Sequence, residues 1–207
     1  MSSSITFKQF IGPAVRAYIP ELARLRISIF REYPYCYDGN LDYEADYLAA
    51  YARSASSLFV LAFDQDNLVG ASTGLPMTDA MADVQTPFIQ HPYPLETVFY
   101  FGESILQPAY RGQGIGHRFF DARENYARQA DETYSAYQYT CFCSVRRADD
   151  DPRRPPGYQS LDAFWGRRGY AKMPLLTTSM TWKEVNQPAE SGHMMDFWLK
   201  DWNCHLS

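Results

Sequence analysis

The chain has 207 residues, of which 46% are hydrophobic and 21% are charged, and these values are typical of a single globular domain with a sizeable core. Its net charge of −5 gives no attraction to DNA, RNA or an acidic membrane surface, so we expect no nucleic-acid and no membrane partner. The first residues form no basic leader followed by an apolar run, and no segment approaches the length of a membrane span, which predicts a cytoplasmic protein.

The first quarter of the chain predicts a strand and two helices joined by an aromatic loop. Residues 5–19 favour a strand with a turn at Gly12-Pro13, and a helix then begins at Pro20, because proline suits the first helical turn. Residues 33–40 contain three tyrosines and end in turn residues, which indicates a loop. A second helix follows, with one face made of Tyr43, Tyr47, Leu48 and Tyr51 and with acidic residues elsewhere, namely Asp42, Glu44 and Asp46.

The middle of the chain predicts four strands and a long loop. Residues 58–63 and 68–75 flank a polar four-residue turn and are typical of an antiparallel hairpin. Residues 76–95 lack a regular period and contain four prolines, which indicates a long loop. Strands are expected over residues 97–106 and, because of their Tyr, Thr, Phe and Val content, over residues 137–145.

The last part of the chain predicts a charged loop, a short helix and a closing hairpin. Residues 146–159 interleave arginines with aspartates and prolines, so a solvated loop is a better interpretation than a nucleic-acid patch. A short helix over residues 161–168 ends at Gly169. Two β-like runs follow, over residues 175–182 and 193–199, and we expect them to pair with each other.

Residues 111–116, RGQGIG, form a glycine-rich turn between a predicted strand and a predicted helix. The helix is indicated by Phe119, Phe120 and Arg123, which recur with further apolar residues at steps of three and four. Backbone N–H groups at a helix N-terminus lack intrahelical partners and lie at the positive end of the dipole, which suits a phosphate. Glycine lets an anion approach the backbone closely and permits positive φ. The turn therefore predicts a ligand that carries phosphate.

The spacing of the turn separates several classes of phosphate-binding site. A P-loop needs Gly-Lys-Ser/Thr where this chain has Gly116-His117-Arg118, and the G-x-G-x-x-G pattern of dinucleotide folds is not met. Residues 107–116, QPAYRGQGIG, instead resemble the acyl-CoA signature of the GNAT acetyltransferase superfamily, Gln/Arg-x-x-Gly-x-Gly/Ala. Its fixed positions are filled by Arg111, Gly114 and Gly116.

The resemblance implies an α/β, single-domain GNAT-like fold over residues 1–207, with a mixed, mostly antiparallel sheet, splayed central strands and flanking helices. It implies an acetyl-CoA-dependent N-acetyltransferase that uses acetyl-CoA as co-substrate, needs no metal, and acts by direct attack in a ternary complex. The expected acceptor is a primary amine of a small molecule or an amino-acid-like compound. A protein or peptide N-acetyltransferase and a non-catalytic acyl-CoA-binding module remain as alternatives, and a homodimer is compatible with the sequence.

The family pattern also implies where acetyl-CoA lies. Its pantetheine arm would follow the strand before the turn, and its pyrophosphate would lie on the amides of the turn. By resemblance, the cofactor-binding residues are Ser104, Ile105, Leu106, Arg111, Gly112, Gln113, Gly114, Ile115 and Gly116.

Acyl transfer to an amine needs a base, an oxyanion donor and an acid for the leaving thiolate. Glu103 is the candidate base, although it could instead pair with an arginine or take up the charge of the substrate. The backbone N–H of Leu106 is the candidate oxyanion donor. Many relatives place a tyrosine four residues before the glycine that ends the last short helix, where this chain has Trp165, whose indole is no general acid. Either the thiolate leaves unassisted or another group protonates it, for which the candidates are Tyr158, Ser144 and Cys143.

Residues 33–47 lie in the region where relatives build a wall of the acceptor site. Aromatic rings and carboxylates together attract a cationic amine, so we predict substrate binding by Tyr35, Tyr37 and Asp38. The alternative is that the tyrosines belong to the core and the acidic residues to a solvated helix face. The cysteines are too few and scattered for a disulfide framework or a metal site, so free thiols are expected at Cys36, Cys141, Cys143 and Cys204.

Overall fold

The computed structural model describes residues 5–129 and 136–203 and is built on one eight-stranded sheet. In spatial order the strands are β1 (Ile5–Ile11), β2 (Leu58–Asp64), β3 (Asn67–Pro76), β4 (Val98–Tyr100), β6 (Tyr139–Val145), β8 (Glu190–Asp201) and β7 (Ala171–Lys183), and β5 (Ser104–Leu106) pairs with β3. The pair β4 and β6 is parallel, whereas the other pairs are antiparallel. This is the mixed, mostly antiparallel α/β fold that the sequence predicts.

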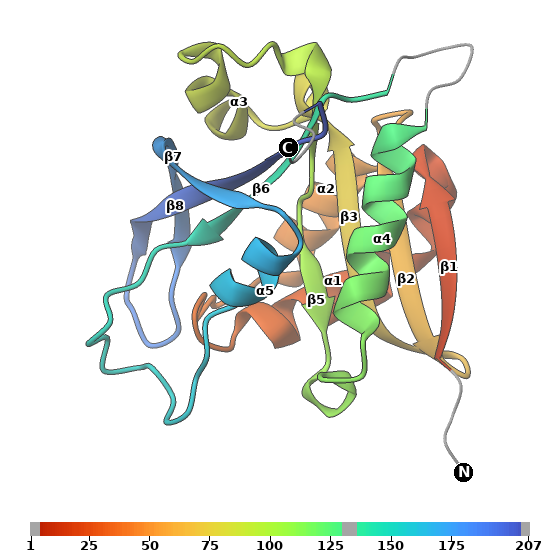
Figure 1. Ribbon diagram of the computed structural model, residues 1–207. Coiled ribbons are helices and arrows are strands. Elements are labelled where there is room, and N and C mark those ends of the chain that lie inside the picture. Colours follow the sequence, from red (N-terminus) through yellow and green to blue (C-terminus); the bar gives the residue numbers. More distant parts are fainter. Residues whose placement is uncertain (1–4, 130–135, 204–207) are drawn as a thin grey trace.

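Helices cover both faces of the sheet (Figure 1). α1 (Ile19–Phe30) and α2 (Leu41–Tyr51) pack against each other behind it, and α4 (Ile115–Arg128) packs in front against β2 and β3. α3 (Ala82–Ile89) contacts β7, and α5 (Asp162–Arg167) lies beside the lower part of α4. Short 3-10 turns complete the list, at Gly12–Tyr18, Met77–Asp79, Leu95–Thr97 and Pro108–Tyr110.

The core has two parts, one on each face of the sheet. β2 contributes to both, because Phe59, Leu61 and Phe63 alternate with Leu58, Val60 and Ala62 and successive strand residues point to opposite faces. The first set packs with α1 and α2, and the second packs with Phe119 and Phe120 of α4. A strand buried on both faces is an uninterrupted apolar run, which is how the sequence of β2 reads.

The central strands separate after Phe101. The N–H of Phe101 still donates to the carbonyl of Cys141 at 2.7 Å, but the N–H of Gly102 donates to Thr73 on the other side, at 3.1 Å. A side chain at Gly102 would lie 2.7 Å from Thr73 Oγ1, so this close approach requires glycine. The strand expected over residues 97–106 is therefore two strands, and only the first pairs with β6. These are the splayed strands that the family resemblance implied.

Two expectations are wrong, one near the N-terminus and one in the middle of the chain. Residues 12–18 form a 3-10 helix and not a continuation of the strand, because Gly12 has φ of +53° and Pro13 follows at the start of the helix. The predicted loop over residues 76–95 contains α3, although Pro87 lies inside it. Proline removes the N–H that would bond to the carbonyl of Asp83, and the hydroxyl of Thr178 in β7 donates to that carbonyl instead, at 2.7 Å.

The C-terminal expectations agree with the structure. β7 and β8 form the closing hairpin and are longer than the apolar runs that predicted them, with an irregularity between Lys172 and Thr177. The short helix is followed by Gly169 at φ of +85°. Cys36, Cys141 and Cys143 are free thiols, and Cys204 lies outside the described residues. In the described ranges no helix is both long and apolar enough to cross a membrane.

Candidate active site

The backbone of β5 directs polar groups away from β3 and toward the gap between the splayed strands. The carbonyl of Glu103 accepts from Thr73 at 3.0 Å and the N–H of Gln107 donates to Val69 at 2.9 Å, so both face β3. Because alternate residues of a strand direct their backbone groups to opposite edges, Ser104 and Leu106 direct theirs away from β3. The family pattern assigns Ser104, Ile105 and Leu106 to the pantetheine arm, but Ile105 is the partner of Ala71 in β3 and directs its backbone groups to that strand.

The glycine turn is an open cradle at the N-terminus of α4. Gly112 and Gly114 have φ of +77° and +79°, and no other group lies within 4 Å of the position that a Cβ would take at either residue. Gly114 is the N-cap residue, and no side chain caps the helix. The N–H groups of the first turn, which begins at Ile115, therefore have no intrahelical partner and face open space. The turn fits a phosphate group in shape and in polarity.

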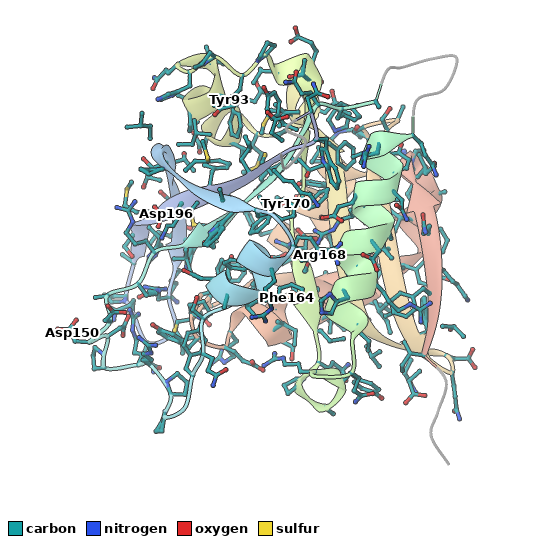
Figure 2. All side chains as sticks on the ribbon, viewed as in Figure 1. Tyr93, Asp150, Phe164, Arg168, Tyr170 and Asp196 are labelled. Carbon is teal, nitrogen blue, oxygen red and sulfur yellow. The ribbon has the colours of Figure 1, made fainter. Side chains whose placement is uncertain are left out.

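Neighbouring elements hold the turn in place. Arg111 donates through Nε to the carbonyl of Leu106 at 3.2 Å and pairs with Glu32 of the segment after α1 at 2.8 Å. On the other side, Figure 2 shows Phe164 and Arg168 beside the lower part of α4. Phe164 packs edge-on against His117 with ring centroids 4.9 Å apart. The cradle is thus fixed to β5, to α1 and to α5.

A cavity of about 690 Å³ lies on the other side of the splayed strands. Its floor includes Tyr100, Gly102 and Glu103 from the splayed strand and Cys143 from β6, so the cavity and the gap meet at Glu103. Its walls come from α1, α2, the loop between them, α3 and the β7–β8 hairpin. The lining is rich in aromatic rings, those of Phe30, Tyr35, Tyr37, Tyr43, Tyr47, Tyr51, Tyr100 and Trp182.

A buried arginine joins two carboxylates inside this cavity. Arg26 of α1 contacts Glu44 of α2 through Nε and lies 2.6 Å from Oε2 of Glu103 through NH1. Its guanidinium also lies between the rings of Phe30 and Tyr47, at 5.0 and 4.4 Å from their centroids. Burial opposes the charge of Arg26, but Glu103, Tyr47 and Glu44 outweigh it and raise the pKa above its ordinary value. Arg26 is therefore a fixed cation with its charge already paired.

The sequence profile of the acetyltransferase (GNAT) family matches residues 22–148, more than half of the chain. The chain belongs to the GNAT acetyltransferase family. It is accordingly an acetyl-CoA-dependent N-acetyltransferase, which agrees with the open glycine cradle and the splayed strands. No curated protein matches the sequence.

Solved structures of the GNAT fold superpose on nearly the whole chain at low sequence identity. A ribosomal-protein-alanine N-acetyltransferase from Brucella melitensis has a TM-score of 0.58 at 13% identity, covering 93% of this chain and 99% of its own. A Salmonella typhimurium protein solved with its cofactor acetyl-CoA has a TM-score of 0.56 at 10% identity, covering 99% and 98%. At these identities the similarity establishes the fold and not the acceptor.

The three predicted substrate-binding residues all line the cavity of this GNAT enzyme. Burial raises the pKa of Tyr35, and burial together with the charge of Glu44 raises that of Tyr37, so both hydroxyls are protonated at neutral pH. Asp38 is already paired, with Lys183 at 3.0 Å and with Arg31 at 3.2 Å, and Lys183 above all lowers the pKa of its carboxyl. The prediction that these residues bind substrate stays open, and Asp38 acts there as part of an ion pair.

The candidate acids for the thiolate lie in different places. Tyr158 is not among the cavity-lining residues and packs edge-on against Tyr33, with centroids 4.7 Å apart. Cys143 lines the cavity and lies 3.2 Å from the hydroxyl of Tyr100, and burial raises its pKa to about 11. Trp165 is half-buried and packs edge-on against Phe142 and Trp198, with ring centroids 5.0 and 5.2 Å apart, so its indole packs against the core.

Sequence reasoning missed the roles of Arg26 and Glu44. Arg26 falls on the apolar stripe of α1, and a charge at such a position was the available signal that a buried partner exists. The sequence pattern placed Tyr43 on the apolar face of the helix and Glu44 off it, but Glu44 is fully buried and Tyr43 is 59% exposed. The helix is rotated so that Glu44 and not Tyr43 faces Arg26, and no local pattern reveals that pairing.

Proposed function

We propose that this enzyme acetylates a primary amine of a small molecule held in the aromatic cavity, by direct attack on acetyl-CoA in a ternary complex. The observation that carries the proposal is the meeting of the cavity and the gap between the splayed strands at Glu103. An acceptor in the cavity and a thioester in the gap would approach each other from opposite sides of one strand, and such alignment is a large part of catalysis in bimolecular reactions.

The cofactor would be held mainly by backbone groups. The pyrophosphate fits the cradle of Arg111, Gly112, Gln113, Gly114, Ile115 and Gly116. The pantetheine arm fits the free edge of β5 at Ser104 and Leu106, with Ile105 between them paired to β3. Support comes from the positive φ of the two glycines and from the absence of a side-chain cap at Gly114. The structural neighbour from Salmonella typhimurium was solved with acetyl-CoA.

Bound acetyl-CoA supplies an activated thioester, and the chain supplies the groups around it. The N–H of Leu106, which faces the gap, would donate to the oxyanion. Glu103 would accept the proton of the amine, directly or through a water, at Oε1, since Arg26 occupies Oε2. Tyr158 remains a candidate for the thiolate proton only if its loop approaches the cavity, and Tyr100 with Cys143 lies closer to Glu103 along the cavity floor.

A small acceptor is favoured over a peptide because both flanking segments contribute walls to the cavity. Tyr37 and Asn40 come from the loop after α1, and Met81 and Val84 come from the region of α3. A peptide would need an open groove under these segments. A non-catalytic acyl-CoA-binding module is the second candidate, and the observation that favours it is Trp165 at the position where relatives carry a tyrosine.

Calorimetric titration with acetyl-CoA, with free CoA and ATP as controls, tests the cradle, and an amine screen with detection of released thiol tests the chemistry. We expect binding of acetyl-CoA and CoA, no binding of ATP, and thiol release with at least one small amine. Binding of acetyl-CoA without thiol release for any amine would favour the non-catalytic module. A failure to bind acetyl-CoA would contradict the assignment of the cradle.

A further inference from the structure

We infer that the acceptor of this enzyme is a primary amine that carries no carboxylate, an aralkylamine or alkylamine, and not an α-amino acid. The inference rests on the proposed function in one respect, that the aromatic cavity is the acceptor site. It narrows that function, because the fold and the family leave amines and amino acids equally open.

The ionisable lining of the cavity is acidic. It has three more carboxylates than bases. The carboxylates are those of Asp38, Glu44, Asp83, Glu103 and Glu190, and the bases are Arg26 and Lys183. Within the described residues, Asp83 and Glu190 form no ion pair. The excess negative charge of the lining therefore favours entry of an ammonium group over entry of a carboxylate.

Neither base of the lining is available to a substrate carboxylate. Arg26 is buried, contacts Glu44 and Glu103 together, and lies between two aromatic rings. If Arg26 turned to an incoming carboxylate, Glu44 and Glu103 would remain buried without a partner, which is strongly unfavourable. Lys183 lies 3.0 Å from Asp38 and is held there at the rim. An amino acid would thus bring its carboxylate into a cavity that has no free cation to receive it.

Two lining residues, Glu44 and Tyr51, each hold a polar atom that is buried behind the surface of the cavity. Glu44 Oε1 and the hydroxyl of Tyr51 make no hydrogen bond of normal geometry with the part of the chain that the structure describes. Both can accept from an N–H donor. Glu44 is fully buried and Tyr51 is 94% buried, so these atoms contribute to the negative character of the lining without contacting an acceptor directly. The surrounding tyrosine rings add favourable faces for a cation and for an apolar body.

Matched pairs of acceptors that differ by one carboxylate test the inference. Tyramine against L-tyrosine and phenethylamine against L-phenylalanine are compared in two ways, by calorimetric affinity with CoA present and by kcat/KM from thiol release. We expect each amine to be preferred by on the order of 100-fold, because juxtaposed like charges in a desolvated site are strongly penalised. Equal values within a pair, or a preference for the amino acid, would overturn the inference.

The two readouts separate this inference from the proposed function. Preferential binding of the amines without thiol release would uphold the inference and contradict the proposed catalysis. Thiol release with L-tyrosine as fast as with tyramine would uphold the catalysis and contradict the inference.

Asp38→Asn gives a second, structural test. It removes the partner of Lys183 and so creates a free cation at the rim, and we expect the amine-to-amino-acid ratio to shrink about tenfold, the equivalent of one favourable charge contact. The matched control is Asp66→Asn, an exposed residue in the turn between β2 and β3, which should leave the ratio unchanged. An unchanged amine-to-amino-acid ratio in a folded Asp38→Asn protein would contradict the claim that the ion pair with Asp38 keeps Lys183 from binding a substrate carboxylate.

Discussion

The glycine cradle and the aromatic cavity, which we propose as the acceptor site, lie on opposite sides of one strand and are built in opposite ways. The cradle consists of backbone groups from six consecutive residues, it is exposed, and its two left-handed glycines face open space. The cavity consists of side chains from segments that are far apart in the sequence, and its inner charges are buried and paired. One site depends on backbone conformation and free volume, and the other depends on charge.

The two sites should therefore fail under different substitutions. Filling the space at the cradle should abolish cofactor binding while the cavity remains intact. Removing a charge in the cavity should change turnover or acceptor affinity while cofactor binding remains intact. Glu103 and Arg123 lie where the two sites meet, and substitutions there test how independent the sites are.

The largest effect is expected for Gly114→Trp. The residue has φ of +79°, which is strained for tryptophan, and the indole would fill the space assigned to the phosphates. We expect affinity for acetyl-CoA, measured by calorimetry, to fall on the order of 1,000-fold because the anion is excluded from the helix N-terminus.

Gly157→Trp is the matched control for backbone strain. Gly157 has φ of +76° and also faces open space, but it lies in the loop after β6. We expect a comparable change in stability by thermal unfolding and no change in affinity. Wild-type affinity in Gly114→Trp would mean that the pyrophosphate lies elsewhere.

Glu103→Gln and Glu44→Gln should separate chemistry from charge pairing. Each variant removes one carboxylate from Arg26, so both should lower the free energy of unfolding, by about 1–3 kcal/mol, because glutamine keeps a hydrogen bond but no charge. Glu103→Gln should also lower kcat about 100-fold, the range of a lost general base. Glu44→Gln should mainly raise the KM of the amine. Equal kcat in Glu103→Gln and wild type would remove Glu103 as the base.

A smaller effect is expected for Arg123→Met, which loosens the junction of the two sites. Arg123 of α4 is fully buried and donates to the carbonyls of Thr73 and Glu103 at 3.3 and 3.2 Å and to Ser104 Oγ at 2.8 Å. Burial lowers its pKa to about 10, so it is still protonated at neutral pH. Without it, β5 loses its fixed position, and we expect the KM for acetyl-CoA to rise about tenfold, the effect of misplacing binding groups by a fraction of a bond length.

The control for Arg123→Met is Arg128→Met, in the last turn of the same helix, where the arginine is exposed and lies over the ring of Trp202. That variant should leave the KM for acetyl-CoA unchanged. Equal KM values in both variants would show that Arg123 stabilises the core without positioning β5.

The contrast between the sites also explains what could be predicted from the sequence. The cradle was predictable because its determinants are local, namely glycines at fixed spacing before a helical period. The two hairpins, β2–β3 and β7–β8, followed from apolar runs separated by polar stretches. The break at Gly102 was not predictable, because it is set by Tyr51 and Thr73 from other elements, which leave no room for a side chain.

The inner cavity could not be predicted for the same physical reason. Arg26 is tolerated in the core only because Glu44 and Glu103 neutralise it, and these partners come from another helix and from the sheet. α3 was missed because the cost of Pro87 is offset by Thr178, whose position far along the chain is unknown until the fold is known. Tertiary partners overrode local preferences in both cases.

The smallest predicted effect concerns the wall of the cavity. Asp151 pairs with Arg153 at 2.7 Å, and Arg153 in turn contacts Glu184. Glu184 also pairs with Arg147 at 2.6 Å, and Arg147 donates to the carbonyl of Tyr35 at 3.0 Å. The hydrogen bond from Arg153, above all, lowers the pKa of Asp151 to about 2. A carboxyl with a lowered pKa in the folded state stabilises the fold above its unfolded pKa, and this contribution is lost as pH falls through the folded pKa.

Asp151→Asn should therefore lower the free energy of unfolding by about 1 kcal/mol at pH 7, a value reduced for solvent screening of the pair. The difference from wild type should disappear as pH falls from about 4 to about 2, because the wild-type carboxyl is then protonated as well. Asp150→Asn is the control, since Asp150 lies at the outer edge of the same loop (Figure 2). Urea unfolding across this pH range makes the measurement. A difference that persists at pH 2 would show that Asp151 stabilises this wall through packing and not through its charge. The wall would then not depend on charge in the way that the inner cavity does.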